Sequence, residues 1–276
     1  MNQKNSYKLV VIIGAIFGMA LITFMYIMYS SLITSSIVQT DGMLTLTIII
    51  LIRIIALTSV AYYMFHKWFK QEKQYFSDIP FLFGLFFLIL TFGKAMDLIW
   101  DLIFFSIDDD TILLLLKIRF FIIIFTTAPM VFLSISMILY YFSLKEKYKN
   151  LKEEKMRNKL SQNILAGTII IEGIAIIIAP DRNSIAIMLP LIVLPSISVI
   201  VWLFYFSYKN KALSQVNSKI LTIGFGGLLV SQTLRPIIQY IFGETTTYII
   251  ICEIIDFFVF FVIILGFFVK AKYAET

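Results

Sequence analysis

Ten ionisable residues lie inside otherwise apolar stretches of the sequence, five of them cationic and five anionic. The cations are Arg53, Lys94, Lys117, Arg119 and Arg235, and the acids are Asp97, Asp101, Glu172, Glu253 and Asp256. A charge at the centre of a membrane helix costs about 2.5–3.5 kcal/mol on insertion scales, so such groups usually pair or face water. Equal numbers of the two signs favour internal pairing, either as ion pairs that fix helix packing or as the lining of a polar pocket.

Helical spacing places these charges on shared faces. Residues three, four or seven positions apart lie on one side of a helix. The polar sets that meet this condition are Lys94 with Asp97 and Asp101, Thr168 with Glu172, Gln232 with Arg235 and Gln239, and Glu253 with Asp256. We expect each face to meet its partner on a neighbouring helix.

Depth within the helices predicts the first pairs. At about 1.5 Å per residue, Asp101 and Lys117 both lie about 10 Å from the turn that joins their helices. We therefore expect Asp101 to pair with Lys117, and Asp97 to pair with Lys94 or Arg119. Lys117 and Arg119 point about 200° apart around one helix, so we expect one of them to reach toward the headgroups instead.

A second pairing is predicted near the end of the sequence. The turn Gly243–Thr246 is short, so the helices on either side should be antiparallel neighbours. Arg235 lies about 12 Å from this turn, between Glu253 at about 10 Å and Asp256 at about 15 Å. We expect Arg235 to pair with one of these two acids.

The composition indicates the elements that must hold these charges. Of the 276 residues, 60% are hydrophobic and 14% are charged, and the mean hydropathy is +0.92. Soluble domains carry about 25% charged residues, so a water-soluble globule is excluded, as is a disordered chain. The sequence predicts an all-α transmembrane bundle, a single integral membrane domain over residues 1–276. Its eight predicted spans are about 8–29, 43–65, 80–106, 111–143, 160–180, 185–207, 218–242 and 247–269.

Basic residues in the loops predict the orientation. Loops on one side and the two ends hold seventeen Lys and Arg residues, whereas the opposite loops hold only Arg182. The positive-inside rule then predicts a multi-pass protein of the cytoplasmic (plasma) membrane with both termini cytoplasmic. All ten buried charges would lie in the outer half or at the middle of the bilayer. This asymmetry favours a charged pocket that faces outward.

The longest inner loop forms a predicted helical linker over residues 143–160. It lacks Gly and Pro, and Glu153 and Arg157 have the favourable i,i+4 order, so we expect the fourth span to continue into it as a helix. Two interpretations remain open for the linker. It is either a solvated segment held near anionic lipid by its lysines, or a docking surface for a cytoplasmic signalling partner.

Residues of about 55–142 carry a set of features found together in one known family. These are a helix that ends in a basic loop, Ala95-Met96-Asp97-Leu98 in the next helix, Pro129 within the following helix, and Tyr140-Tyr141 at its inner end. This region resembles the N-terminal seven-helix sensor region of membrane histidine kinases. Asp97 replaces the usual Glu, one helix precedes the region, and these 276 residues include no kinase or other output domain. The resemblance implies the architecture and a sensing role.

Three functions fit these features. The first is a sensor or receptor-like module that binds a small polar or zwitterionic ligand and signals to a cytoplasmic partner. The second is a small-solute or ion transporter or channel, which would need a polar path through the uncharged inner half. The third is a structural assembly protein whose charges only pair.

Other classes are disfavoured. Cys252 is the only cysteine and His66 the only histidine, so metal and haem sites built from these residues are nearly excluded. We expect no cofactor and no nucleic-acid partner, and the lipid bilayer is the expected environment. An enzyme is not expected, since no nucleophile or metal set accompanies Asp97 and Asp101.

Overall fold

The computed structural model describes residues 3–213, 215–243 and 245–269, and within these ranges it contains helices and no strands. Eight of the described helices are long and apolar enough to cross a membrane, which confirms the all-α prediction and the number of spans. The elements are α1 (Gln3–Met28), α2 (Ser30–Gln39), α3 (Met43–Phe69), α4 (Ile79–Ile103), η1 (Phe104–Ser106), α5 (Asp109–Ser143), η2 (Glu146–Lys152), α6 (Glu154–Ile178), α7 (Arg182–Asn210), α8 (Ser218–Phe242) and α9 (Thr246–Phe268).

Helix α2 was not among the predicted elements. It occupies most of the break between the first two spans and is too short to span a bilayer. The side-chain oxygens of Thr34 and Ser35 donate to the carbonyls of Ser30 and Leu32, both at 2.8 Å. These bonds satisfy the hydroxyls locally, so a helix rich in Ser and Thr persists at a span end.

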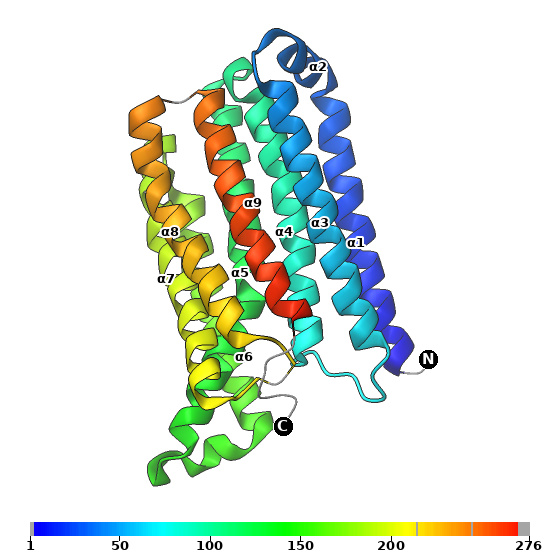
Figure 1. Cartoon of the computed structure of the whole chain (residues 1–276), viewed down its shortest axis with the longest axis vertical. Coiled ribbons are helices and arrows are strands. Elements are labelled where there is room, and N and C mark those ends of the chain that lie inside the picture. Colours follow the sequence, from blue (N-terminus) through cyan, green and yellow to red (C-terminus); the bar gives the residue numbers. More distant parts are fainter. Residues whose placement is uncertain (1–2, 214, 244, 270–276) are drawn as a thin grey trace. The chain divides into compact units, whose positions relative to one another are not determined.

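The prediction that the fourth span continues as a helix through residues 143–160 is wrong. Helix α5 ends at Ser143, the chain forms the 3₁₀ segment η2, and α6 begins at Glu154. The N–H of Leu144 donates to the carbonyl of Tyr141, and that of Lys145 to Phe142, which are the tighter contacts that close a helix end. The segment therefore reverses direction between α5 and α6 (Figure 1).

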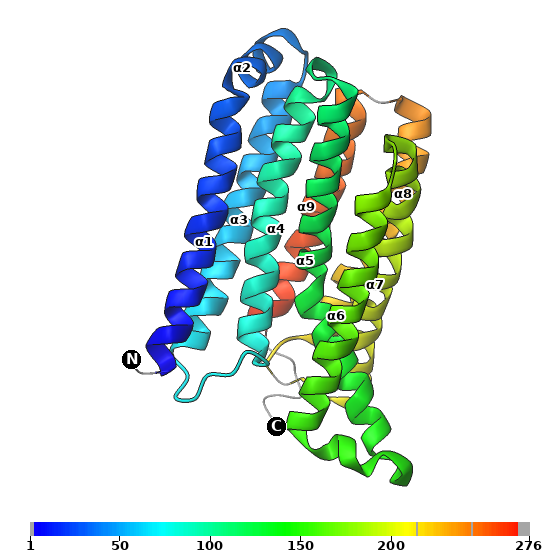
Figure 2. The same cartoon turned by 180° about the vertical axis from the view of Figure 1, so that it is seen from behind.

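The chain divides into two compact units, Met1–Thr126 and Thr127–Thr276. In the first unit, α1 and α3 lie beside α4, and α2 packs across one end of them (Figures 1 and 2). Close approach uses small residues: a Cβ added at Gly18 would lie 2.6 Å from the Phe92 ring, and one at Gly84 would lie 3.0 Å from Phe65. These contacts fix the level of α4 against its neighbours.

One carboxylate, that of Asp78, holds the loop between α3 and α4 in place through hydrogen bonds. Asp78 accepts hydrogen bonds from the indole Nε1 of Trp68 at 3.1 Å and from the backbone N–H of Tyr75 at 2.8 Å. The Trp68 ring is fully buried and its centroid lies 4.7 Å from that of Phe81. This end of the α3–α4 hairpin therefore sets the register between the helices that carry Arg53 and Lys94.

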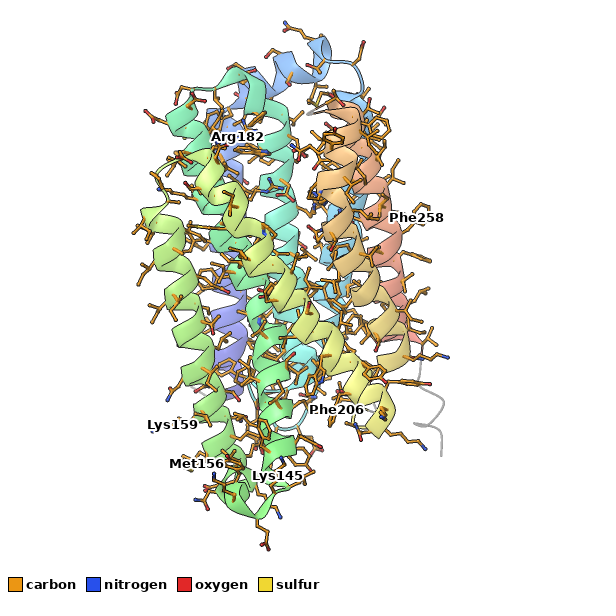
Figure 3. All side chains as sticks on the ribbon, turned by 90° about the vertical axis from the view of Figure 1, so that its left-hand side faces the viewer. Lys145, Met156, Lys159, Arg182, Phe206 and Phe258 are labelled. Atoms are coloured by element: carbon orange, nitrogen blue, oxygen red, sulfur yellow. The ribbon has the colours of Figure 1, made fainter. Side chains whose placement is uncertain are left out.

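In the second unit, α8 packs between α7 and α9. A Cβ at Gly224 would lie 2.6 Å from the Ile263 side chain and 3.0 Å from its backbone nitrogen, so α8 and α9 approach nearly backbone to backbone. The N–H of Asn217 donates to the Gly266 carbonyl at 2.8 Å and locks one end of this pair. Figure 3 shows the side chains along these helices.

Candidate functional site

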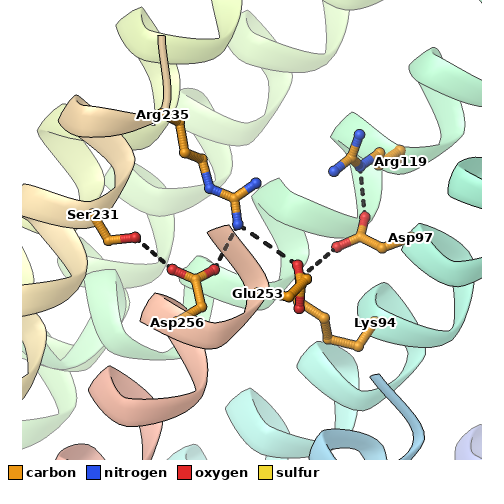
Figure 4. Close-up of polar contacts among 7 residues, drawn as sticks. All are labelled: Lys94, Asp97, Arg119, Ser231, Arg235, Glu253 and Asp256. Carbon is orange, nitrogen blue, oxygen red and sulfur yellow. Dashed lines mark hydrogen bonds and ion pairs between the residues drawn. The ribbon is translucent and has the colours of Figure 1, made fainter. Parts of the chain in front are cut away.

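The first unit contains an ion-paired triplet, called the Asp97 cluster, made of Lys94, Asp97 and Arg119. Asp97 accepts from Lys94 Nζ at 2.8 Å through one carboxylate oxygen and from Arg119 Nε at 2.6 Å through the other (Figure 4). The Arg119 guanidinium also lies 6.0 Å from the centroid of the Trp100 ring. Asp97 thus forms ion pairs with two cations, and one of them, Arg119, also lies against the Trp100 ring.

Helix geometry explains how the Asp97 cluster forms. Lys94 and Asp97 are three residues apart on α4, so they share a face, and Arg119 reaches them from α5. A Cβ at Gly93 would lie 3.2 Å from Ile122, so α5 comes close to α4 beside the cluster. The predicted pairing of Asp97 with Lys94 or Arg119 is confirmed, and both cations contribute.

The second unit contains another group, called the Arg235 cluster, made of Ser231, Arg235, Glu253 and Asp256. Arg235 Nη2 lies 2.6 Å from an Asp256 oxygen and 3.7 Å from a Glu253 oxygen (Figure 4). Ser231 donates to the other Asp256 oxygen at 2.5 Å. The predicted pairing of Arg235 with Glu253 or Asp256 is confirmed, with the shorter contact to Asp256.

Two residues of these clusters were not among the predicted site residues. Ser231 precedes Arg235 by four positions on α8, so the same spacing rule that grouped Gln232 and Gln239 could have found it. Trp100 lies three residues after Asp97 on α4, so helical spacing places it on the same face. Their roles depend on contacts made by another helix, which no spacing rule supplies.

The other predicted site residues occupy varied positions. Arg53 is 2% exposed and shares the buried face of α3 with Ile50 and Leu57. Glu172 lies on a half-covered face of α6 and forms no ion pair with any described residue. The described contacts do not test the pairing of Asp101 with Lys117, nor a binding role for Gln232 and Gln239, so these stay predictions.

Two aspartates outside the spans cap the N-termini of helices α5 and α7. Asp108, before α5, accepts from the Thr111 N–H at 2.7 Å, and Asp181, before α7, accepts from the Ser184 N–H at 2.8 Å. These backbone bonds favour the ionised carboxylate, so the pKa of each aspartate falls below its ordinary value of 3.8. Both groups therefore stay charged at neutral pH.

The two clusters supply binding chemistry. Lys94, Arg119 and Arg235 are donors suited to carboxylate or phosphate groups, and Asp97, Glu253 and Asp256 are acceptors suited to an ammonium group. Among the described residues, no group of three or more His, Cys, Asp and Glu could hold a metal ion.

Compared with known proteins, the chain matches no family model, no curated protein and no solved structure.

Proposed function

We propose that this chain is a multi-pass membrane sensor that binds a small polar or zwitterionic ligand at its outward charged groups and signals to a cytoplasmic partner. The observation that carries the proposal is the presence of the Asp97 and Arg235 clusters among helices apolar enough to span a membrane. Each cluster combines cationic hydrogen-bond donors with anionic hydrogen-bond acceptors. Such groups are costly in lipid and usually mark function.

The proposed orientation has both termini in the cytoplasm, supported by seventeen basic residues on one side against Arg182 on the other. Single cysteines in a Cys252→Ser background test it. Positions 41, 109, 182 and 245 should react with an impermeant thiol reagent from outside, and positions 70, 150 and 211 only after permeabilisation. Two positions on the wrong side would overturn this topology.

Sensing also draws support from the resemblance of residues 55–142 to histidine-kinase sensor regions. In such a module, ligand binding changes helix packing, and the change must reach a cytoplasmic surface. The turn between α5 and α6 is suited to report it, because α5 runs from the Asp97 cluster to that turn.

A fluorophore on Met156→Cys, in the Cys252→Ser background, tests the sensing proposal. The purified protein in nanodiscs is titrated with three zwitterions, glycine, glycine betaine and phosphocholine, and with acetate and choline as singly charged controls. We expect a saturable change with a zwitterion that is lost in Asp97→Asn or Asp256→Asn. The exposed Asp110→Asn undergoes the same chemical change outside the clusters and should keep the response. A folded protein that responds to none of the zwitterions would contradict the proposal and favour a purely structural role.

A transporter is the second candidate, favoured by buried serines at the proposed inner ends of α5, α6, α7 and α8. Ser143, Ser161, Ser207 and Ser218 are each 0% exposed. The hydroxyls of Ser161 and Ser207 make no hydrogen bond to any described residue, so each could hold a water or a passing polar solute. Uptake of radiolabelled glycine or betaine into proteoliposomes distinguishes the candidates, since a sensor binds without flux.

A further inference from the structure

The turn between α5 and α6 forms a strongly basic surface, called here the basic hairpin (residues 142–160). It holds seven basic and three acidic residues. The basic residues are Lys145, Lys147, Lys149, Lys152, Lys155, Arg157 and Lys159, and the acidic residues are Glu146, Glu153 and Glu154. Six of the seven cations are lysines, which act as mobile point charges and lack the planar fork that arginine uses for bidentate binding. This composition suits a diffuse anionic surface better than a single phosphorylated peptide.

Apolar side chains are exposed on the same hairpin. Leu144 is 61% exposed, Met156 is 51% exposed and Tyr148 is 42% exposed. A linker in water would gain nothing from exposed Leu and Met beside its lysines. Cations mixed with apolar and aromatic side chains are typical of segments that lie in a membrane interface.

Several of the cations lie against aromatic rings. Lys145 Nζ is 5.9 Å from the Phe142 ring centroid, Lys147 Nζ is 5.6 Å from that of Tyr148, and the Arg157 guanidinium is 5.5 Å from that of Tyr140. The charges and the rings therefore occupy one layer. Aromatic rings prefer the headgroup level of a bilayer, where the neighbouring cations would meet lipid phosphates.

The length of α5 places the hairpin at that level. Its 35 residues span about 52 Å, compared with about 40–45 Å for a bilayer with its headgroups. A helix that begins at one interface thus ends at or just beyond the other, and the hairpin follows at once. Figure 3 shows Lys145, Met156 and Lys159 gathered at one end of the second unit, the end opposite Arg182.

We propose that the basic hairpin binds the anionic lipid headgroups of the cytoplasmic leaflet and inserts its exposed apolar side chains among them. The two flanking spans hold the hairpin at the bilayer, so little entropy is lost when it settles on the surface. Lipid charge then controls how the hairpin is presented to the cytoplasm. This inference extends the proposed orientation to a specific lipid partner and is independent of the ligand.

The test measures how well acrylamide, a neutral quencher, reaches a fluorophore at Met156→Cys in the Cys252→Ser protein. The full chain is compared in phosphatidylcholine nanodiscs and in discs with two-fifths phosphatidylglycerol. We expect quenching to fall at least about twofold in the anionic discs, and high salt to reverse the effect, because the attraction is electrostatic.

Two triple variants provide the matched comparison. Replacing Lys145, Lys147 and Lys152 by Gln should abolish the difference between the two lipids. The control replaces Lys67, in the last turn of α3, and Lys70 and Lys73, which follow that helix, also by Gln; all three are exposed. It removes the same charge and should preserve the difference between the two lipids. Equal quenching in both lipids, or equal loss in both triple variants, would overturn the proposal. If a cytoplasmic protein lowers the quenching in phosphatidylcholine discs while the anionic discs have no effect, the surface belongs to a protein partner, and that would also overturn the proposal.

Discussion

The two charge clusters satisfy buried charge with opposite arrangements. In the Asp97 cluster one carboxylate lies between two cations, at 2.8 Å from Lys94 and 2.6 Å from Arg119. In the Arg235 cluster one guanidinium lies between two carboxylates. The residue at the centre of each cluster therefore contacts two groups of the opposite charge.

Burial differs between the clusters as well. Replacing the central residue leaves Glu253 and Asp256, whose side chains are 4% and 2% exposed, in the Arg235 cluster. In the Asp97 cluster it leaves Lys94 and Arg119, whose side chains are 8% and 26% exposed. Desolvation makes an uncompensated charge more costly the less water reaches it. Replacing the central residue should therefore be more damaging in the Arg235 cluster than in the Asp97 cluster.

The largest effect is expected from Arg235→Gln. This change leaves Glu253 and Asp256 without their shared guanidinium, so the free energy of unfolding should fall by about 3–5 kcal/mol. SDS titration in mixed micelles measures it. Arg235→Lys should recover part of the loss, because Lys keeps the charge but not the planar fork. Lys219→Gln, an exposed cation on the same helix, is the control, and an equal loss there would refute the role of the cluster.

A smaller loss is expected from Asp97→Asn. The amide retains the shape but leaves Lys94 and Arg119 without their shared acid, and partial exposure limits the cost to about 2 kcal/mol. The same SDS titration applies, and Asp110→Asn is the exposed control. If Asp97→Asn destabilises the protein more than Arg235→Gln does, the ranking of the two clusters by burial is wrong.

Glycine contacts extend the comparison to packing. Gly224→Ala should cost about 1–3 kcal/mol, because the new Cβ meets the Ile263 backbone, which cannot turn aside. Gly18→Ala should cost less, because it meets the outer edge of the Phe92 ring, which can rotate. Gly226→Ala and Gly14→Ala are matched controls with no atom within 4 Å of the new Cβ. Thermal unfolding in detergent should give this order, and a loss at Gly226 equal to that at Gly224 would contradict it.

The smallest effects are expected at the capping aspartates Asp108 and Asp181. Their pKa values are lowered in the folded state, so the stabilisation is present above the ordinary value of 3.8 and is lost as the pH falls through the folded-state pKa. Changing either residue to Ala should lower the unfolding temperature near neutral pH and make no difference in strong acid. Asn should preserve the cap without that dependence on pH. A difference between wild type and the Ala variant that persists unchanged in strong acid would contradict this account.

The spans and the faces of the charged helices could be predicted from the sequence. The predicted limits 218–242 agree with α8, and the limits of α9 differ from the prediction by one residue at each end, because sharp turn residues flank these helices. The pairing of Arg235 was also predictable, since a short turn fixes the relative level of two antiparallel helices. Helix α2 and the end of α5 at Ser143 were not predicted, because both depend on local hydrogen bonds rather than on hydropathy.

By itself, the sequence determined that the chain is apolar and helical, with equal numbers of cations and acids within its apolar stretches, because hydropathy and helical period depend only on residue order. Only the tertiary structure decided that Asp97 forms ion pairs with both Lys94 and Arg119, and that Ser231 donates a hydrogen bond to Asp256. It also decided how closely α8 and α9 approach, through the contact of Gly224 with Ile263. Distances between side chains on different helices depend on how those helices rotate and pack, and one-dimensional spacing carries no information about that.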